Sequence, residues 1–217
     1  MSVKVGILVS GRGSNMVSLI QAEKAGKLGG ATIVVVISDV PDAPALEKAR
    51  GLGVEAICVE TESQKARLSA NDQERIIAEL EKRGVELVCL AGFMRIIGER
   101  MLQHYVGRML NIHPSLLPSF TGLGVQKKAL EYGVRYSGCT VHFVTADVDC
   151  GPIIIQAVVP VLPEDTSESL AERILAQEHK IYPQAVTWYA EGKLSFDGRR
   201  VMVAGGYPWR EYISQEE

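Results

Sequence analysis

Four short apolar runs rich in valine and isoleucine recur along the first half of the chain. They cover residues 3–9, 31–37, 85–90 and 109–112, and stretches with helical spacing separate them. This alternation of strand and helix is typical of β-α-β units on a parallel sheet. Such strands lack a polar face because helices cover both sides of the sheet. The sequence therefore predicts an α/β fold with a mostly parallel sheet and helices on both faces.

Two helices of this first half are expected from their ends. Residues 15–25 carry an apolar stripe at helical spacing, and Ser14 is the predicted N-cap. A second helix is predicted over residues 71–83, with Asn71 or Asp72 as its cap.

The pattern changes in the last third of the chain. Residues 137–144 and 152–161 are predicted to be longer strands, joined through a turn that contains Asp149. A long helix is expected from Thr166, and Pro183 is expected to kink or interrupt it. These C-terminal strands and the long helix extend the predicted sheet.

Composition excludes several classes of partner. The chain has 217 residues and a net charge of −3, which argues against a nucleic-acid or anionic-membrane surface. It has no apolar run of the roughly 20 residues that a membrane helix needs. The N-terminus leads directly into a strand rather than a signal peptide, so a cytoplasmic location is predicted. The four cysteines form no Cys-x-x-Cys pair, and neither a metal site nor a disulfide framework is expected.

Asn111 and His113 stand at the end of a predicted strand and are followed by a proline-bounded loop. Residues two apart in a strand face the same side, so Asn111 could donate to an oxyanion while His113 handles a proton of the same substrate. Asp149 could complete this set from its turn. The alternative is structural, with the amide and imidazole satisfying local backbone groups and the acid serving the turn.

A glycine-containing loop at residues 10–15 follows the first strand and opens the first helix. Its N–H groups and the positive end of the helix could hold a phosphate. The loop lacks the third glycine of a dinucleotide fingerprint and has no Gly-Lys-Ser/Thr, which disfavours NAD or a P-loop nucleotide. A simple tight turn is the alternative.

Five blocks of sequence, in order, closely resemble the glycinamide ribonucleotide formyltransferase family. They are residues 10–15, 90–97, 110–118, 137–156 and 177–183. The resemblance implies a Rossmann-like formyltransferase fold and an enzyme that moves a formyl group from 10-formyltetrahydrofolate to the amine of glycinamide ribonucleotide, in de novo purine biosynthesis. It also implies a single domain over residues 1–217, with a phosphate-binding half at about 1–105 and a catalytic and folate-binding half at about 106–205.

The resemblance assigns roles residue by residue. The catalytic residues would be Asn111, His113 and Asp149. The phosphate and ribose of glycinamide ribonucleotide would be bound by Gly11, Gly13, Ser14, Asn15 and Glu178. The folate would be bound by Met94, Arg95, Ile96, Ile97, Thr145, Ala146, Asp147 and Val148, with Arg67 as a candidate for its glutamate tail.

One position departs from the family pattern. Gly124 stands where the family commonly has a histidine, which weakens any role for that imidazole and suggests a more flexible loop. The remaining histidines, His104, His142 and His179, are predicted to be structural.

Three other functions are considered. A 10-formyltetrahydrofolate hydrolase resembles the same catalytic core but carries an additional N-terminal regulatory domain, and a methionyl-tRNA formyltransferase is longer and needs a basic RNA-binding extension. A non-catalytic folate or phosphate binder is the third. The expected partners are the two small-molecule substrates, with no metal, nucleic acid or membrane, and the protein is expected to be a monomer or homodimer.

Overall fold

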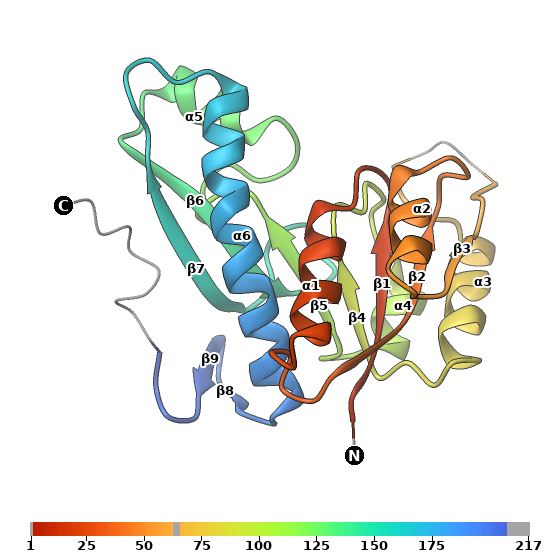
Figure 1. The fold of residues 1–217 in the computed structure, drawn as a ribbon. Helices are drawn as coiled ribbons and strands as arrows, with labels where there is room; N and C mark the ends of the chain where they lie inside the picture. The colour runs from red at the N-terminus through yellow and green to blue at the C-terminus, as the bar shows by residue number, and fades with distance from the viewer. Residues whose placement is uncertain (1, 63–65, 208–217) are drawn as a thin grey trace. The chain divides into compact units, whose positions relative to one another are not determined.

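The computed structural model describes residues 2–62 and 66–207 (Figure 1). It contains two compact units, residues 1–111 and residues 112–217, and each has its own architecture.

The first unit is a parallel sheet with helices. Its strands are β1 (Lys4–Val9), β2 (Thr32–Ser38), β3 (Ala56–Cys58), β4 (Leu87–Leu90) and β5 (Met109–His113), whose last two residues begin the second unit. Its helices are α1 (Ser14–Lys24), α2 (Pro44–Gly51), α3 (Ala70–Glu81) and α4 (Glu99–His104). The strand order is β3-β2-β1-β4-β5, and the neighbours pair in parallel.

This strand order reverses between β1 and β4. The chain moves outward from β1 to β3 and then returns to the other side of β1, so right-handed crossovers place α1 and α2 on one face and α3 and α4 on the other (Figure 1). A reversal of this kind opens a crevice at the carboxyl ends of the two strands. The loops that follow β1 and β4 therefore leave the sheet side by side.

Two predicted helix caps are wrong. Helix α1 begins at Ser14, and its N-cap is Gly13, in the left-handed region with φ 72°. Helix α3 is capped by Ser69, whose hydroxyl accepts from the N–H of Asp72 while the Asp72 carboxylate accepts from the N–H of Ser69. Both errors amount to one or a few residues. For α3 the cause is that several neighbouring polar side chains can serve as the cap, whereas the cap of α1 is a glycine with no side-chain hydrogen bond.

The second unit contains two long strands and one long helix. Its elements are α5 (Val125–Tyr132), β6 (Tyr136–Phe143), β7 (Ile153–Pro160), α6 (Ser167–Ala190), β8 (Leu194–Asp197) and β9 (Arg200–Val203). Strands β6 and β7 pair in antiparallel fashion, and α6 packs against both. Strands β8 and β9 form a separate hairpin.

Helix α6 continues through Pro183, so the predicted interruption is wrong. Pro183 and its neighbours Ile181 and Tyr182 are buried. Packing of this apolar face against the strands offsets the hydrogen bond that the proline cannot donate.

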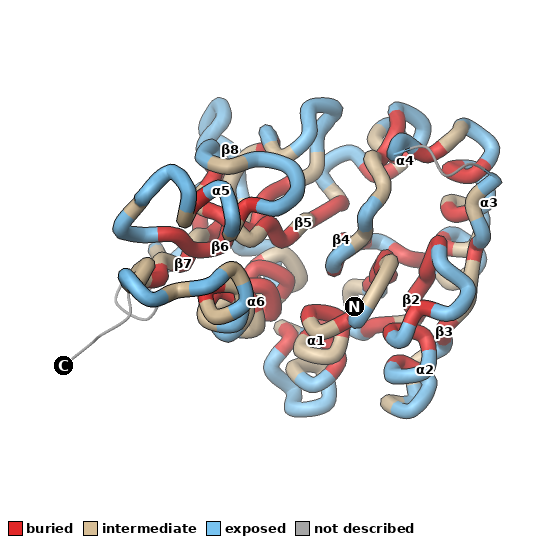
Figure 2. The backbone as a smooth tube through the Cα atoms, turned by 90° about the horizontal axis from the view of Figure 1, so that it is seen from above, coloured by how far each residue is buried: buried red, intermediate tan, exposed pale blue. Residues whose placement is uncertain are grey.

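The strands β1 to β7 form the buried centre of the units, whereas the β8–β9 hairpin, the loops and the outer faces of the helices are largely exposed (Figure 2). The predicted α/β class, with a mostly parallel sheet extended by C-terminal strands and a long helix, is confirmed. Among the residues that the structure describes, no helix is long and apolar enough to span a membrane.

Candidate active site

Strand β5 carries Asn111 and His113 at alternate positions, so their side chains leave the same face of the strand. Asn111 is aligned with Leu90 of β4, at the carboxyl end of that strand. His113 is buried and begins the proline-bounded loop.

Thr140 of β6 holds the loop that follows His113. Its hydroxyl donates to the carbonyl of Ser115 over 2.7 Å and accepts from the N–H of Leu117 over 3.1 Å. Gln156 of β7 donates to the carbonyl of Leu117 over 2.9 Å. These buried bonds fix the loop, which contains a cis peptide between Leu117 and Pro118.

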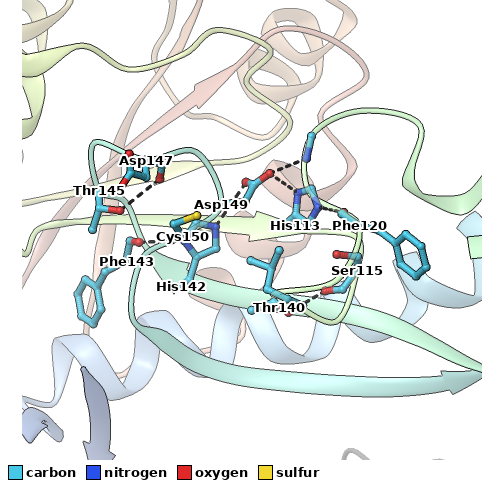
Figure 3. A network of polar contacts seen from close by, with 12 residues as sticks. His113, Ser115, Phe120, Thr140, His142, Phe143, Thr145, Asp147, Asp149 and Cys150 are labelled. Atoms are coloured by element: carbon cyan, nitrogen blue, oxygen red, sulfur yellow. Dashed lines mark hydrogen bonds and ion pairs between the residues drawn. The ribbon is translucent and has the colours of Figure 1, made fainter. Parts of the chain in front are cut away.

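Both ring nitrogens of His113 face an acceptor (Figure 3). Nδ1 lies 3.4 Å from Oδ2 of Asp149, and Nε2 lies 3.0 Å from the carbonyl oxygen of Phe120. A protonated imidazole can donate from both nitrogens, whereas a neutral one can donate from one. The surroundings of His113 therefore match the hydrogen-bonding capacity of an imidazolium.

Asp149 has a constrained position in the turn between β6 and β7. Its φ of 55° lies in the left-handed region, which aspartate and asparagine tolerate better than most residues. Oδ2 accepts from the N–H of Gly122 over 2.9 Å. Two residues later, a Cβ on Gly151 would lie 1.7 Å from the carbonyl oxygen of Phe143, so this turn requires glycine there. The turn thus delivers the buried carboxylate to His113.

His142 also approaches Asp149, which sequence reasoning did not foresee. Its Nε2 lies 3.9 Å from Oδ1 of Asp149, and Nδ1 lies 2.8 Å from the carbonyl oxygen of Phe143 (Figure 3). Burial lowers the pKa of His142, and the bond to the Phe143 carbonyl and the charge of Asp149 partly oppose this effect. The sequence does contain a signal for this approach. His142 lies two residues after Thr140 on β6, so both side chains leave the same face of the strand, and Thr140 bonds to the loop that follows His113.

The candidate phosphate loop follows β1. Gly13, in the left-handed conformation, is packed so closely that a Cβ there would lie 2.7 Å from Cβ of Ala45. The carbonyl of Gly11 accepts from the N–H of Ala45, and the carbonyl of Arg12 accepts from Nζ of Lys48. These two bonds tie the loop to α2. The first backbone N–H groups of a helix such as α1 have no carbonyl partner within the helix.

The candidate folate loop, residues 94–97, follows β4 in the same unit. Ile96 forms an isolated parallel bridge with Arg67, and Nη1 of Arg67 donates to the carbonyl of Ile97 over 3.3 Å. The structure therefore brings Arg67 to this loop, although the two are far apart in sequence. The guanidinium of Arg95 is directed to Asp39, 3.8 Å away, so it is held within the protein.

The other predicted site residues lie in the second unit. Residues 145–148 are exposed in the turn before Asp149. Glu178 is buried on α6. Gly124 is the N-cap of α5, with φ 66°, a conformation that a histidine would adopt only with strain.

No group of three or more histidine, cysteine or acidic side chains is arranged to hold a metal ion in the described part of the chain. Its four cysteines are free, and Cys150, next to Asp149, is exposed.

Comparison with known proteins identifies the family of this chain. The formyl transferase family model matches residues 3–186. Phosphoribosylglycinamide formyltransferase of Escherichia coli is 40% identical over 210 residues, which cover 94% of this chain and 98% of that protein. The human trifunctional purine biosynthetic protein adenosine-3 is 43% identical over 189 residues, which cover 87% of this chain and 18% of that longer protein.

The crystal structure of glycinamide ribonucleotide transformylase 1 from Symbiobacterium toebii is also similar. It is 47% identical, the match covers 93% of this chain and 94% of that one, and the TM-score is 0.88. The Escherichia coli protein and the Symbiobacterium toebii structure each match more than nine-tenths of this chain. The chain therefore belongs to the formyl transferase family, among the phosphoribosylglycinamide formyltransferases.

Proposed function

We propose that this enzyme transfers the formyl group of 10-formyltetrahydrofolate to the primary amine of glycinamide ribonucleotide, giving N-formylglycinamide ribonucleotide for de novo purine biosynthesis. The observation that carries the proposal is the pairing of His113 with Asp149 over 3.4 Å. His113 lies two residues after Asn111 on one strand. An amide donor, an imidazole and a buried carboxylate in this order suit acyl transfer.

The reaction requires no water and no redox step. The amine nitrogen bonds to the formyl carbon, and the carbonyl electrons move to oxygen to form a tetrahedral oxyanion. Asn111 donates a hydrogen bond to that oxygen, and the positive ring of His113 stabilises its charge. The attacking nitrogen then loses a proton and the folate nitrogen gains one. The oxyanion electrons form the C=O bond again as the bond between carbon and the folate nitrogen breaks, which releases tetrahydrofolate. Asp149 orients the imidazole and stabilises its charged form.

Binding is proposed to follow the family assignments. The N–H groups of Gly13, Ser14 and Asn15, at the start of α1, suit a phosphate, and Glu178 would hold the ribose. Residues 94–97 and residues 145–148 would contact the folate. Because the guanidinium of Arg95 is held at Asp39, Arg95 would contribute through its backbone.

The direct test follows tetrahydrofolate release with and without glycinamide ribonucleotide, and mass spectrometry of the nucleotide product. Release should depend on the nucleotide, whose mass should increase by one formyl group in place of one hydrogen. Equal release without the nucleotide, with formate as product, would indicate the hydrolase instead.

A non-catalytic binder is distinguished by the same assay. It would bind both ligands at equilibrium but would release no tetrahydrofolate above the rate of a His113→Ala control. Turnover should persist after exhaustive chelation, and recovery of a dead apo-enzyme by a metal would contradict the proposed chemistry.

A further inference from the structure

A second polar network lies in the first unit, apart from His113 and Asp149. Asp39 follows the end of β2, and its side chain is 4% exposed. Its Oδ1 accepts from the hydroxyl of Ser10 over 2.6 Å. The same hydroxyl accepts from the backbone N–H of Met94 over 2.8 Å. The side chain of Ser10 therefore links three segments that are distant in sequence.

Two of these segments have a place in the proposed binding sites. Ser10 is the first residue of the phosphate loop, and Met94 is the first residue of the candidate folate loop. A further bond lies nearby, because the N–H of Ser10 donates to the carbonyl of Gly92, two residues before Met94, over 3.1 Å. The two loops leave the neighbouring strands β1 and β4 at the point where the strand order reverses.

The charge of Asp39 has a specific partner. The guanidinium of Arg95, whose side chain is 8% exposed, lies 3.8 Å from Oδ2 of Asp39. A buried carboxylate is costly unless it is paired and hydrogen-bonded. Asp39 meets both conditions, one through the phosphate loop and the other through the folate loop. An asparagine whose oxygen accepts from Ser10 would turn its NH2 group toward the guanidinium, so the charge pairing would be lost.

We propose that Ser10 and Asp39 are positioning residues that hold the phosphate loop and the folate loop in one shared geometry. Binding of glycinamide ribonucleotide and of the folate then depends on the same hydroxyl and the same carboxylate, although neither residue needs to touch a substrate. This inference rests on the proposed function of the two loops. It extends that function by assigning one support to two binding sites.

The test uses Ser10→Ala, Asp39→Asn and the double variant. For each, the Kd of glycinamide ribonucleotide and of a non-reactive folate analogue is measured by calorimetry, and KM and single-turnover rates are measured in parallel. Each single variant should weaken both ligands by about tenfold, the scale of one hydrogen bond to a charged group. The single-turnover rate at saturation should change by less than about threefold, since the reacting groups are untouched.

The double variant should bind each ligand about as tightly as the weaker-binding single variant, because both changes break the same network. A purely local role predicts additive effects instead. Additive losses, a loss for one ligand alone, or no loss for either would overturn the proposal.

Ser38→Ala is the matched control. The hydroxyl of Ser38, one residue before Asp39, is buried but bonds to the carbonyl and N–H of Val40, over 2.9 Å and 3.0 Å. Ser38→Ala should lose about as much thermal stability as Ser10→Ala, with no change in the Kd of either ligand. An equal effect of Ser38→Ala on binding would reduce Ser10 to a structural residue and refute the proposal. Failure of the proposed function is separate, because it would appear as wild-type protein that binds neither ligand or transfers no formyl group.

Discussion

The two polar networks of this protein use their buried carboxylates differently. Asp39, in the first unit, is paired with a hydroxyl and an arginine, and an arginine stays charged at all relevant pH values. Asp149, in the second unit, lies between two imidazoles, 3.4 Å from His113 and 3.9 Å from His142. One carboxylate thus has a fixed counter-charge, whereas the other has partners that can gain or lose a proton.

This difference separates positioning from chemistry. A network with a fixed charge can hold two loops in place, but it cannot accept or release protons during turnover. A carboxylate with histidine partners can favour a charged imidazole and orient it. Damage to the Asp39 network should therefore appear mainly in binding, and damage around Asp149 should appear mainly in the chemical step.

The largest expected effect comes from His113→Ala. General acid–base groups contribute about 10²–10⁴-fold to rate, so the single-turnover rate should fall by that range. Binding of glycinamide ribonucleotide should remain close to wild type, because the candidate phosphate loop belongs to the other unit. Rapid-quench measurements and calorimetry check the two parts.

Asp149→Asn sharpens the same prediction, because asparagine keeps the shape and tolerates the φ of 55°. It should retain the bond from Gly122 but lose the charge beside the imidazoles. The single-turnover rate should fall by about 10²-fold, which is less than the loss expected for His113→Ala. Full activity of Asp149→Asn would make Asp149 a turn residue and would remove the contrast between the two carboxylates.

Asn111→Ala should have an effect at least as large as that of Asp149→Asn. Loss of one oxyanion donor costs about 10²–10³-fold in kcat in acyl-transfer enzymes. The KM of both substrates should change little, since the interaction forms in the transition state. Asn111→Asp is the matched control, because a carboxylate of similar shape should repel the oxyanion and be at least as slow. A large rise in KM with unchanged kcat would instead place Asn111 in ground-state binding.

The main strands could be predicted from sequence because each carries a short run of mostly apolar residues, and stretches with helical spacing separate these runs. For example, β1 begins at Lys4, one residue after the predicted start. Helix ends were less certain, since Ser69 and Asp72 both suit a cap and the choice depends on backbone geometry. The course of α6 through Pro183 depends on tertiary packing, which no local signal reports.

The candidate site shows the same limit. Asn111 and His113 share a face because of strand periodicity, which sequence reveals directly. The pairing of His113 with Asp149 was expected from the family blocks and the turn, and the structure places them together. Asp39 was not foreseen, because its contact with Ser10 spans 29 residues and its contact with Arg95 joins two different loops. No periodicity or motif connects such positions.

A smaller effect, specific to the first unit, is expected for Gly11→Val. No atom lies within 4 Å of a Cβ at Gly11, so a side chain can start from this position in the phosphate loop. It should raise the KM of glycinamide ribonucleotide by about tenfold, or ~1.4 kcal/mol. The KM of the folate should stay nearly constant, in contrast to the Ser10→Ala variant. Equal changes in both would argue against a local phosphate site.

Gly13 is a poor position for the same experiment. Its left-handed φ of 72° and the 2.7 Å approach to Ala45 mean that Gly13→Ala strains the backbone and the packing together. The left-handed conformation alone should cost about 1–2 kcal/mol of unfolding free energy. Denaturant unfolding should therefore show a loss for Gly13→Ala and little change for Gly11→Ala, which separates folding from phosphate binding.

The smallest expected effect is the pH dependence that His142 contributes to stability. Burial lowers its pKa in the folded state below the ordinary value of 6.5. As the pH falls below about 6.5, the unfolded chain takes up a proton that the folded protein does not, so the unfolding free energy falls until the lower folded pKa is reached. Above that window both states are neutral, and His142 contributes no slope. His142→Gln should lose this part of the acid dependence. The unfolding free energies of wild type and variant are measured from pH 7.5 to pH 5 in about half-unit steps, and their difference isolates the contribution of His142 from that of other groups.

Asp149→Asn should lower the pKa of His142 further, because the carboxylate charge raises it. NMR titration of His142 in both proteins checks the sign. An unchanged titration would mean that Asp149 does not act on this ring, and the contrast with the arginine-paired Asp39 would then rest on His113 alone.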